Sequence, residues 1–179
     1  MVSLVNFVVL LVVLFSLAEG MALHKSVTLH CNSDDGGIES VRSRLRTRDD
    51  ASDRRTIWLH KGEKLNIGFS LPKEAIVDVK DVRYSNDGGQ DRIKLNLDNQ
   101  ELGVFWTNSL NGTGNAWNTF WSSGPIGEMV RVDAGKHMLS LKVEEADEYG
   151  VEIDYIRFEV YGSISQELQQ EDFICKHHK

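Results

Sequence analysis

The densest group of side chains suited to ligand contact lies in residues 111–121, which read NGTGNAWNTFW. Glycine and asparagine at this density favour a loop, because both tolerate the backbone angles of turns. Tryptophan and phenylalanine favour burial, because each ring carries a large apolar surface. Two interpretations follow. Either the loop inserts its rings into a core, or it presents at least one ring, with asparagine amides beside it, to a ligand.

A second stretch of the same character, YSNDGG, begins at Tyr84. A ligand with C–H faces and hydroxyl edges needs flat rings on loops with polar groups nearby, and loops on a rigid scaffold are a common place for both. Tyr84 and Trp117 supply rings, while Asn86, Asn115 and Asn118 supply amides. The structural alternatives are that either ring packs in the core and that Asn86 only shapes a turn.

The other aromatic residues are assigned mainly to the core. We expect Trp58, Phe120 and Trp121 to pack in the core. Phe105 and Trp106 are adjacent, so one of them must face outward if they belong to a regular strand.

The first twenty residues have the pattern of a secretory signal peptide. Their apolar run over residues 7–17 is too short to span a bilayer, and the tripeptide AEG that follows has the small-x-small pattern of a cleavage site. We therefore expect residues 1–20 to be removed and residues 21–179 to form one secreted domain without a membrane span. The residues before the apolar run include no Lys or Arg, which leaves an uncleaved anchor as the alternative.

Charge and cysteine content also restrict the class of protein. The formal net charge of −7 argues against a nucleic-acid partner, and acidic residues interrupt the basic stretch RSRLRTRDDASDRR, which we interpret as a solvated loop. Cys31 and Cys175 predict a disulfide in a secreted chain, with two separate buried thiols as the alternative. Asn111 begins an Asn-Gly-Thr sequon and predicts surface glycosylation.

Short segments with strand periodicity follow one another over residues 56–160. Residues 76–84 and 151–160 alternate apolar and polar side chains with period two. Further strands are expected at residues 56–59, 65–71, 93–97, 101–106, 129–132 and 137–143. Residues 32–55 are assigned mostly to loops, and the tail sequence SQELQQEDF to a short helix. The pattern predicts an all-β protein, an antiparallel β-sandwich or barrel.

The order of these segments resembles the carbohydrate-binding modules of families 6 and 35 over about residues 56–160. Five elements carry the resemblance: RYSN from Arg83, LDN from Leu97, TGNAW from Thr113, GKH from Gly135 and EIDYIRF from Glu152. None is specific alone, but their order and spacing are moderately specific. The resemblance implies a galactose-binding-like jelly roll that grips sugar chains and catalyses no reaction.

In such modules the ligand lies between loops at one end of the sandwich, against two aromatic rings and an amide. The resemblance places the rings at Tyr84 and Trp117 and the amide position at Glu152. This is a departure from the family pattern, because a carboxylate accepts hydrogen bonds from sugar hydroxyls but cannot donate them at pH 7.

The resemblance also implies a structural calcium ion, held by acidic residues of the first and last strands. Asp154 matches the last-strand ligand, and Asp34, Asp35 or Glu39 offer oxygens in the first-strand region. No other cofactor is expected.

Two other functions are weighed against a secreted lectin-like protein. The same loop end could serve as an extracellular protein-interaction surface. A glycosidase would need paired carboxylates, for which the acidic run EEADEYGVE is the candidate. We interpret that run as a solvated turn before a strand, and the sequence contains no nucleophile elbow, zinc-binding His pair or phosphate loop.

Overall fold

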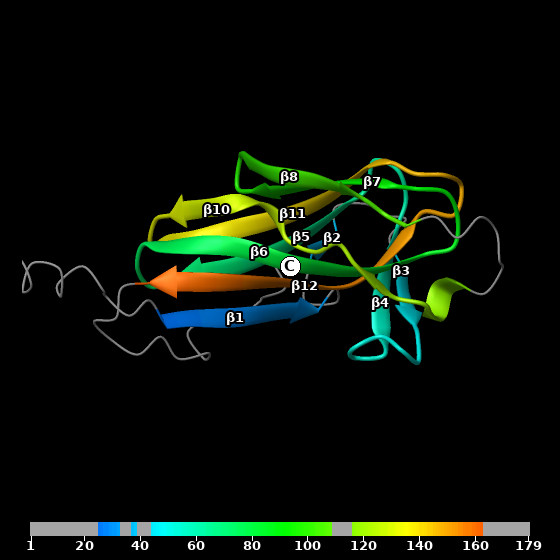
Figure 1. Cartoon of the computed structure of the whole chain (residues 1–179), viewed down its shortest axis with the longest axis horizontal. Helices are drawn as coiled ribbons and strands as arrows, with labels where there is room; N and C mark the ends of the chain where they lie inside the picture. Colours follow the sequence, from blue (N-terminus) through cyan, green and yellow to red (C-terminus); the bar gives the residue numbers. More distant parts are fainter. Residues whose placement is uncertain (1–24, 33–36, 39–43, 109–115, 163–179) are drawn as a thin grey trace, which may run out of the picture.

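The protein consists of two antiparallel β-sheets packed face to face (Figure 1). The computed structural model describes residues 25–32, 37–38, 44–108 and 116–162. Within these residues the only helix is the 3-10 helix η2 (Ala116–Asn118). No helix in the described part is long and apolar enough to cross a membrane. The predicted antiparallel β-sandwich is confirmed.

The first sheet is organised around the last strand, β12 (Val151–Gly162). One edge of β12 pairs with β6 (Ala75–Asn86) along nearly its whole length. Its other edge is shared between β4 (Arg55–Leu59), which pairs with the start of β12, and β1 (Lys25–Asn32), which pairs with the rest. The remaining members are β3 (Arg44–Thr47), β9 (Trp121–Ser122) and β10 (Ile126–Val132).

The second sheet has the strand order β2-β5-β11-β7-β8. Its central strand β11 pairs with β5 on one side and with β7 on the other. The strands of this sheet are β2 (Gly37–Ile38), β5 (Lys64–Leu71), β7 (Arg92–Leu97), β8 (Gln100–Trp106) and β11 (Gly135–Glu145).

The core lies between the two sheets and is filled by alternate residues of the long strands. Every second residue of a strand points to the same face, so the period-two pattern of the sequence becomes one apolar face per sheet. Phe69 on β5 and Phe158 on β12 face each other across the core with ring centroids 5.1 Å apart. Buried aliphatic residues of the same core include Ile67, Val77, Val79, Leu95, Leu139, Leu141, Ile156 and Val160.

All eight strands predicted from periodicity are present, but four strands, β1, β2, β3 and β9, were not predicted. β3 lies inside residues 32–55, which were assigned mostly to loops. It is an edge strand, and its Leu45 is exposed, so it has no apolar face that alternation could reveal. The pairing of β1 with β12 also extends the sandwich to residues before position 56. The predicted helix in the tail lies outside the described residues.

The two ends of the sandwich differ in construction. At one end the strands are joined by tight turns after Leu71, Leu97 and Val132; we call this the turn end, on the left of Figure 1. At the other end lie the β3–β4 hairpin, η2 and the connection between β11 and β12. We call this the loop end, on the right of Figure 1.

A glycine in the β11–β12 connection gives a first prediction. Gly150 has a φ of +69°, and a Cβ added there would lie 2.3 Å from the Leu59 carbonyl oxygen, whereas Gly62 has a φ of +86° and open space around it. Gly62→Ala therefore adds only backbone strain, about 1 kcal/mol, while Gly150→Ala adds a steric clash and should cost about 3 kcal/mol. Urea unfolding of both variants measures the difference; equal losses would contradict the close approach at Gly150.

Candidate functional site

A pocket of about 420 Å³ opens at the loop end of the first sheet. It is lined by Arg46, Arg48, Trp58, Trp117, Tyr149 and Glu152. We call it the loop-end pocket. Its residues come from four separate stretches of the chain, so the pocket exists only when β3, β4, η2 and the start of β12 are brought together.

The floor of the loop-end pocket is the outer face of the first sheet. Glu152 on β12 is paired directly with Trp58 on β4, and their neighbours Ile153 and Ile57 form the next pair. Both isoleucines are buried in the core, so alternation directs Trp58 and Glu152 to the opposite, outer face. Two of the predicted site residues, Trp117 and Glu152, therefore line one pocket.

Glu152 is only 1% exposed, and its carboxylate is held by two neighbours. The Nε of Arg48 donates a hydrogen bond of 2.8 Å to Oε2, and Nη2 of the same guanidinium forms an ion pair with Oε1. The Thr56 hydroxyl donates a further bond of 2.7 Å to Oε2. The hydrogen bond to Glu152 raises the pKa of Arg48, against the opposing effect of burial. Such two-pronged pairs fix geometry as well as charge.

The aromatic walls of the pocket are packed against arginines. The Arg46 guanidinium lies over the Trp58 ring, 4.5 Å from its centroid, and the Arg48 guanidinium lies 5.6 Å from the centroid of Trp117. The Trp58 indole N–H donates a hydrogen bond of 2.6 Å to the Tyr149 carbonyl, which ties the β11–β12 connection to β4. Tyr149 itself is 49% exposed. These cation–π contacts orient rings that stay accessible from the pocket.

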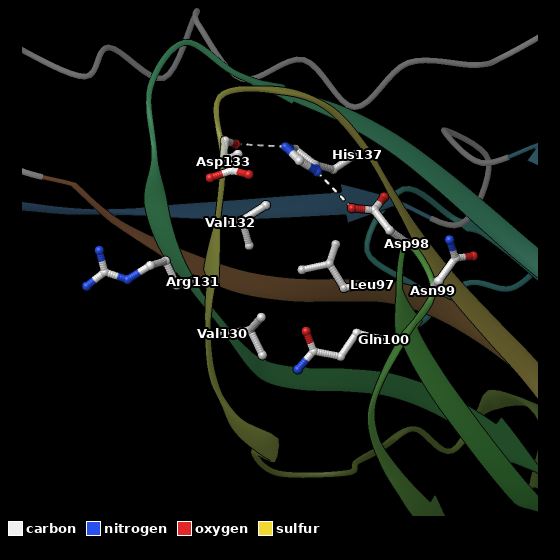
Figure 2. Close-up of a pocket in the computed structure, with 9 residues that line it drawn as sticks. All are labelled: Leu97, Asp98, Asn99, Gln100, Val130, Arg131, Val132, Asp133 and His137. Carbon is white, nitrogen blue, oxygen red and sulfur yellow. Dashed lines mark hydrogen bonds and ion pairs between the residues drawn. The ribbon is translucent and has the colours of Figure 1, made fainter.

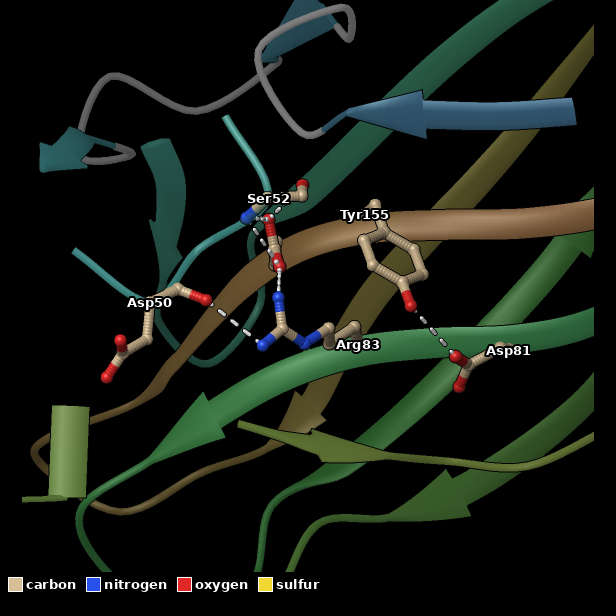
Figure 3. A network of polar contacts seen from close by, with 6 residues as sticks. Asp50, Ser52, Asp81, Arg83 and Tyr155 are labelled. Atoms are coloured by element: carbon tan, nitrogen blue, oxygen red, sulfur yellow. Dashed lines mark hydrogen bonds and ion pairs between the residues drawn. The ribbon is translucent and has the colours of Figure 1, made fainter. Parts of the chain in front are cut away.

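A second buried carboxylate, Asp154, holds the segment between β3 and β4 on the same sheet face. Asp154 accepts hydrogen bonds from the Ser52 backbone N–H (3.0 Å) and hydroxyl (2.7 Å) and forms an ion pair with Arg83. Arg83 also donates to the Asp50 carbonyl at 3.0 Å (Figure 3). The guanidinium of Arg83 in turn lies 4.5 Å from the centroid of Phe120. Asp154 thus has a structural role: it holds the β3–β4 segment, which contributes residues to the pocket, against the sheet.

Asp154 does not fit as a calcium ligand. Its oxygens accept hydrogen bonds from Ser52, and a guanidinium cation already stands beside them. A divalent ion at that position would meet the positive charge of Arg83. The described residues contain no group of three or more His, Cys, Asp and Glu that could hold a metal. The other predicted ligand, Asp34, lies outside the described residues.

The prediction that Tyr84 stacks on a ligand is wrong, because the ring is 1% exposed. It packs in the core near Phe105 and Trp121, with centroid distances of 5.6 and 6.2 Å. Its hydroxyl accepts a hydrogen bond of 3.0 Å from the Asn108 backbone N–H, and burial raises its pKa. The register of β6 against β12 shifts between Val79 and Asp81, so the residues after the bulge change face and Tyr84 turns inward.

Asn86 is likewise not available to a ligand. It is fully buried, and its amide donates to the Gly89 carbonyl at 2.5 Å and to the Thr107 hydroxyl at 2.8 Å. Its side-chain oxygen accepts a bond of 2.8 Å from Gly88 N–H. The structural alternative, a residue that shapes the turn, is therefore the correct one. Asn118, in contrast, is exposed beside Trp117 on η2.

Three predictions fall on residues outside the described part of the chain. Asn115 and the glycosylation sequon at Asn111 lie there, as does Cys175. Only the backbone of Cys31 is described, opposite Ile156 in the pairing of β1 with β12. The amide at position 115, the glycan and the disulfide therefore stay predictions.

The sequence interpretation missed four residues of the pocket: Arg46, Arg48, Trp58 and Tyr149. Trp58 was assigned to the core, yet the segment TIWL contained the signal that places it outside, since alternation puts it on the face opposite Ile57. Of the adjacent pair, Phe105 is buried and Trp106 is 51% exposed, which confirms that one of the two faces outward.

A pair of aspartates holds the connection that carries Tyr149. Asp147 accepts hydrogen bonds from the backbone N–H groups of Gly89 (2.6 Å) and Tyr149 (2.8 Å). Asp91 is fully buried; one oxygen accepts a bond of 3.3 Å from the Asp147 N–H, and the other oxygen has no partner in the described structure. Burial first, and then the negative charge of Asp147, raise the pKa of Asp91 to about 7.

The fold is shared with carbohydrate-binding modules of known structure. A family 35 module from Clostridium thermocellum superposes with a TM-score of 0.58 at 15% identity, over 74% of this chain and 97% of the module. The C-terminal family 6 module of a laminarinase from Zobellia galactanivorans gives a TM-score of 0.52 at 18% identity, over 74% and 98%. The likeness to family 6 and 35 modules inferred from the sequence is thus confirmed in the fold.

The same sandwich also occurs inside longer enzymes. A β-(1,4)-mannanase of Podospora anserina with a family 35 module matches over 80% of this chain and 29% of its own length, with a TM-score of 0.54 and 16% identity. No protein-family model matches the sequence. No curated protein matches it either. At these identities the comparisons establish the shared architecture alone.

The Glu152–Arg48 pair gives a second prediction. Arg48→Ala would leave a buried carboxylate without its cation, and we expect a loss of about 3 kcal/mol in the free energy of unfolding. Glu152→Gln leaves a partly exposed guanidinium that water can solvate, at a cost of about 1 kcal/mol. Arg54→Ala is the control, because its ion pair with Asp49 is exposed and should contribute less than about 1 kcal/mol. Chemical denaturation compares the three; Arg48→Ala matching the control would refute the scaffold role.

The raised pKa of Asp91 gives a third prediction. In the unfolded chain the Asp91 carboxyl has its ordinary pKa of 3.8, so the folded state binds this proton more tightly. The folded state therefore loses stability as the pH rises from about 4 to about 7. Asp91→Asn should remove this loss and stabilise the protein at about pH 8 relative to about pH 5, by at most about 3 kcal/mol. Unfolding at both pH values tests it, with exposed Asp50→Asn as control; unchanged pH dependence in Asp91→Asn would count against the shift.

Proposed function

We propose that this chain is a secreted, non-catalytic carbohydrate-binding protein that holds a saccharide in the loop-end pocket. The observation that carries the proposal is that three aromatic rings share one pocket with three polar side chains: Trp58, Trp117 and Tyr149 with Arg46, Arg48 and Glu152. The proposal requires no cofactor.

The chemistry of the pocket suits a sugar ring. A saccharide has C–H faces that an aromatic ring can cover and hydroxyl edges that need hydrogen-bond partners. Trp117 and the half-exposed Tyr149 offer the apolar surfaces. The Arg46 guanidinium has its described contact with the Trp58 ring, so its N–H groups stay available as donors to hydroxyl oxygens. Exposed Asn118 adds an amide next to Trp117.

The acidic groups near the pocket favour binding over hydrolysis. Glycoside hydrolysis needs one carboxylic acid and one carboxylate placed on either side of the scissile bond. Here Glu152 is ion-paired with Arg48, and Asp147 accepts backbone hydrogen bonds that shape the turn. Glu144, the first residue of the acidic run, is ion-paired with Arg92 on the neighbouring strand. These three carboxylates are therefore engaged in contacts that stabilise the fold.

The architecture and the leader sequence support the same proposal. The two modules described above are carbohydrate-binding modules by name, and the mannanase carries one beside its catalytic part. A signal-peptide pattern over residues 1–20 and a sequon at Asn111 are both typical of exported proteins. We therefore place the sugar-binding role outside the cell.

A glycan array with matched tryptophan variants tests the proposal. We expect the protein to bind at least one class of glycan and Trp117→Ala to weaken that binding about tenfold or more, because a covered sugar face is lost. Trp106→Ala removes an equally large exposed ring outside the pocket and should bind like the unaltered protein. Equal binding by both variants would remove Trp117 from the site. Absence of any glycan signal, with sugar-insensitive capture of an extracellular protein, would contradict carbohydrate binding itself.

A further inference from the structure

A second pocket, of about 440 Å³, lies at the turn end of the sandwich. Figure 2 shows its lining residues. We call it the turn-end pocket. It lies between the β7–β8 turn and the segment that runs from β10 into β11. Its lining residues are Leu97, Asp98, Asn99, Gln100, Val130, Arg131, Val132, Asp133 and His137. None of them contributes to the loop-end pocket.

His137 fixes the two rims of this pocket relative to each other. Its Nδ1 lies 2.9 Å from Oδ2 of Asp98 on one rim, and its Nε2 lies 2.9 Å from the carbonyl oxygen of Asp133 on the other (Figure 2). The Met138 N–H donates a hydrogen bond of 2.8 Å to Oδ1 of Asp98, and the Asp98 N–H donates to the Met138 carbonyl at 2.7 Å. The side chain of His137 is only 10% exposed. The pocket is therefore preorganised, which lowers the entropic cost of binding.

Three polar side chains at the rim have no partner within the described structure. Asn99, Gln100 and Asp133 are exposed, and their side chains form no hydrogen bond or ion pair with described residues. Two amides supply donors and acceptors, and the carboxylate supplies acceptors. Together they can serve vicinal hydroxyl groups, which donate and accept at the same time.

The floor and the charge of the pocket restrict the ligand further. Leu97, Val130 and Val132 give an aliphatic surface that suits C–H groups. The one arginine, Arg131, is ion-paired with Glu74. With Asp133 uncompensated nearby, an anionic ligand is disfavoured. A metal ion is disfavoured too, because the described residues gather no cluster of three or more ligating side chains.

We propose that the turn-end pocket is a second binding site, for a neutral saccharide ring. Its C–H face would lie on Leu97, Val130 and Val132, and its hydroxyls would bond to Asn99, Gln100 and Asp133. With both pockets occupied, a single chain could bridge two saccharide strands, a consequence that rests on the proposed function of the loop-end pocket. The turn-end site itself does not depend on that function, since it shares no residue with the first pocket.

Residue-resolved NMR tests the second site directly. The isotope-labelled full mature chain is titrated with methyl glycosides of glucose, galactose, mannose and xylose at millimolar concentration. We expect at least one of these sugars to shift the backbone amide signals of Asn99, Gln100 and Asp133. The double variant Gln100→Ala, Asp133→Ala should bind that sugar about tenfold more weakly at the turn end, because two sets of hydrogen bonds are lost.

Matched variants separate the two sites. Gln90→Ala alters an exposed glutamine outside both pockets and should leave every shift unchanged, and Trp117→Ala should abolish only the shifts around the loop-end pocket. Turn-end shifts that persist in the double variant, or the absence of turn-end shifts with all four glycosides, would overturn the second site. If the sugars shift the turn-end signals but leave the signals of Trp58 and Trp117 unchanged, the result counts against the proposed function and not against the second site.

Discussion

The structure at the loop end depends on the neutralisation of two buried carboxylates. Glu152 and Asp154 both leave β12 on its outer face, and each is paired with one arginine, Arg48 or Arg83. A buried carboxylate without a partner would be strongly destabilising, so these pairs are required as long as the acids are present. Because Arg48 follows β3 directly and Arg83 holds the Asp50 carbonyl, the same pairs bind the β3–β4 segment to the sheet.

This constraint also places the aromatic rings of the loop-end pocket. The guanidinium that neutralises Glu152 is the one that lies near the Trp117 ring, so the position of the ring depends on a charge pair inside the sheet face. Arg83 has the same double role toward Asp154 and Phe120. The turn end uses a comparable device, in which His137 connects two chain segments. At both ends, therefore, polar side-chain contacts hold chain segments that are distant in sequence in a fixed relative position.

The sequence predicted the fold more reliably than the site, for a physical reason. Strands such as β6, β7, β11 and β12 bury one face, so their alternation is visible in the sequence. β3 buries no apolar face, and its pairing with β4 is made by backbone groups that carry no sequence signal. Tyr84 was misplaced because YSNDGG was interpreted as a loop, whereas β6 continues to Asn86 and the bulge earlier in this strand directs Tyr84 into the core. The three-residue spacing from Val79 to Val82 marked that bulge, but only the pairing register shows which residues change face.

The segment EIDYIRF shows why a resemblance carries further for architecture than for chemistry. Its apolar members, Ile153, Ile156 and Phe158, fill the core, and that spacing is what a shared sandwich requires. Its acidic members can change partners without altering the strand. Here Asp154, expected to hold a metal ion, lies at an irregularity of β12 and is ion-paired with Arg83, while Glu152, at the position of an amide, is ion-paired with Arg48. Two arginines thus stand beside the two carboxylates, so that under the proposed function the aromatic walls and Arg46 would supply the contacts to a sugar.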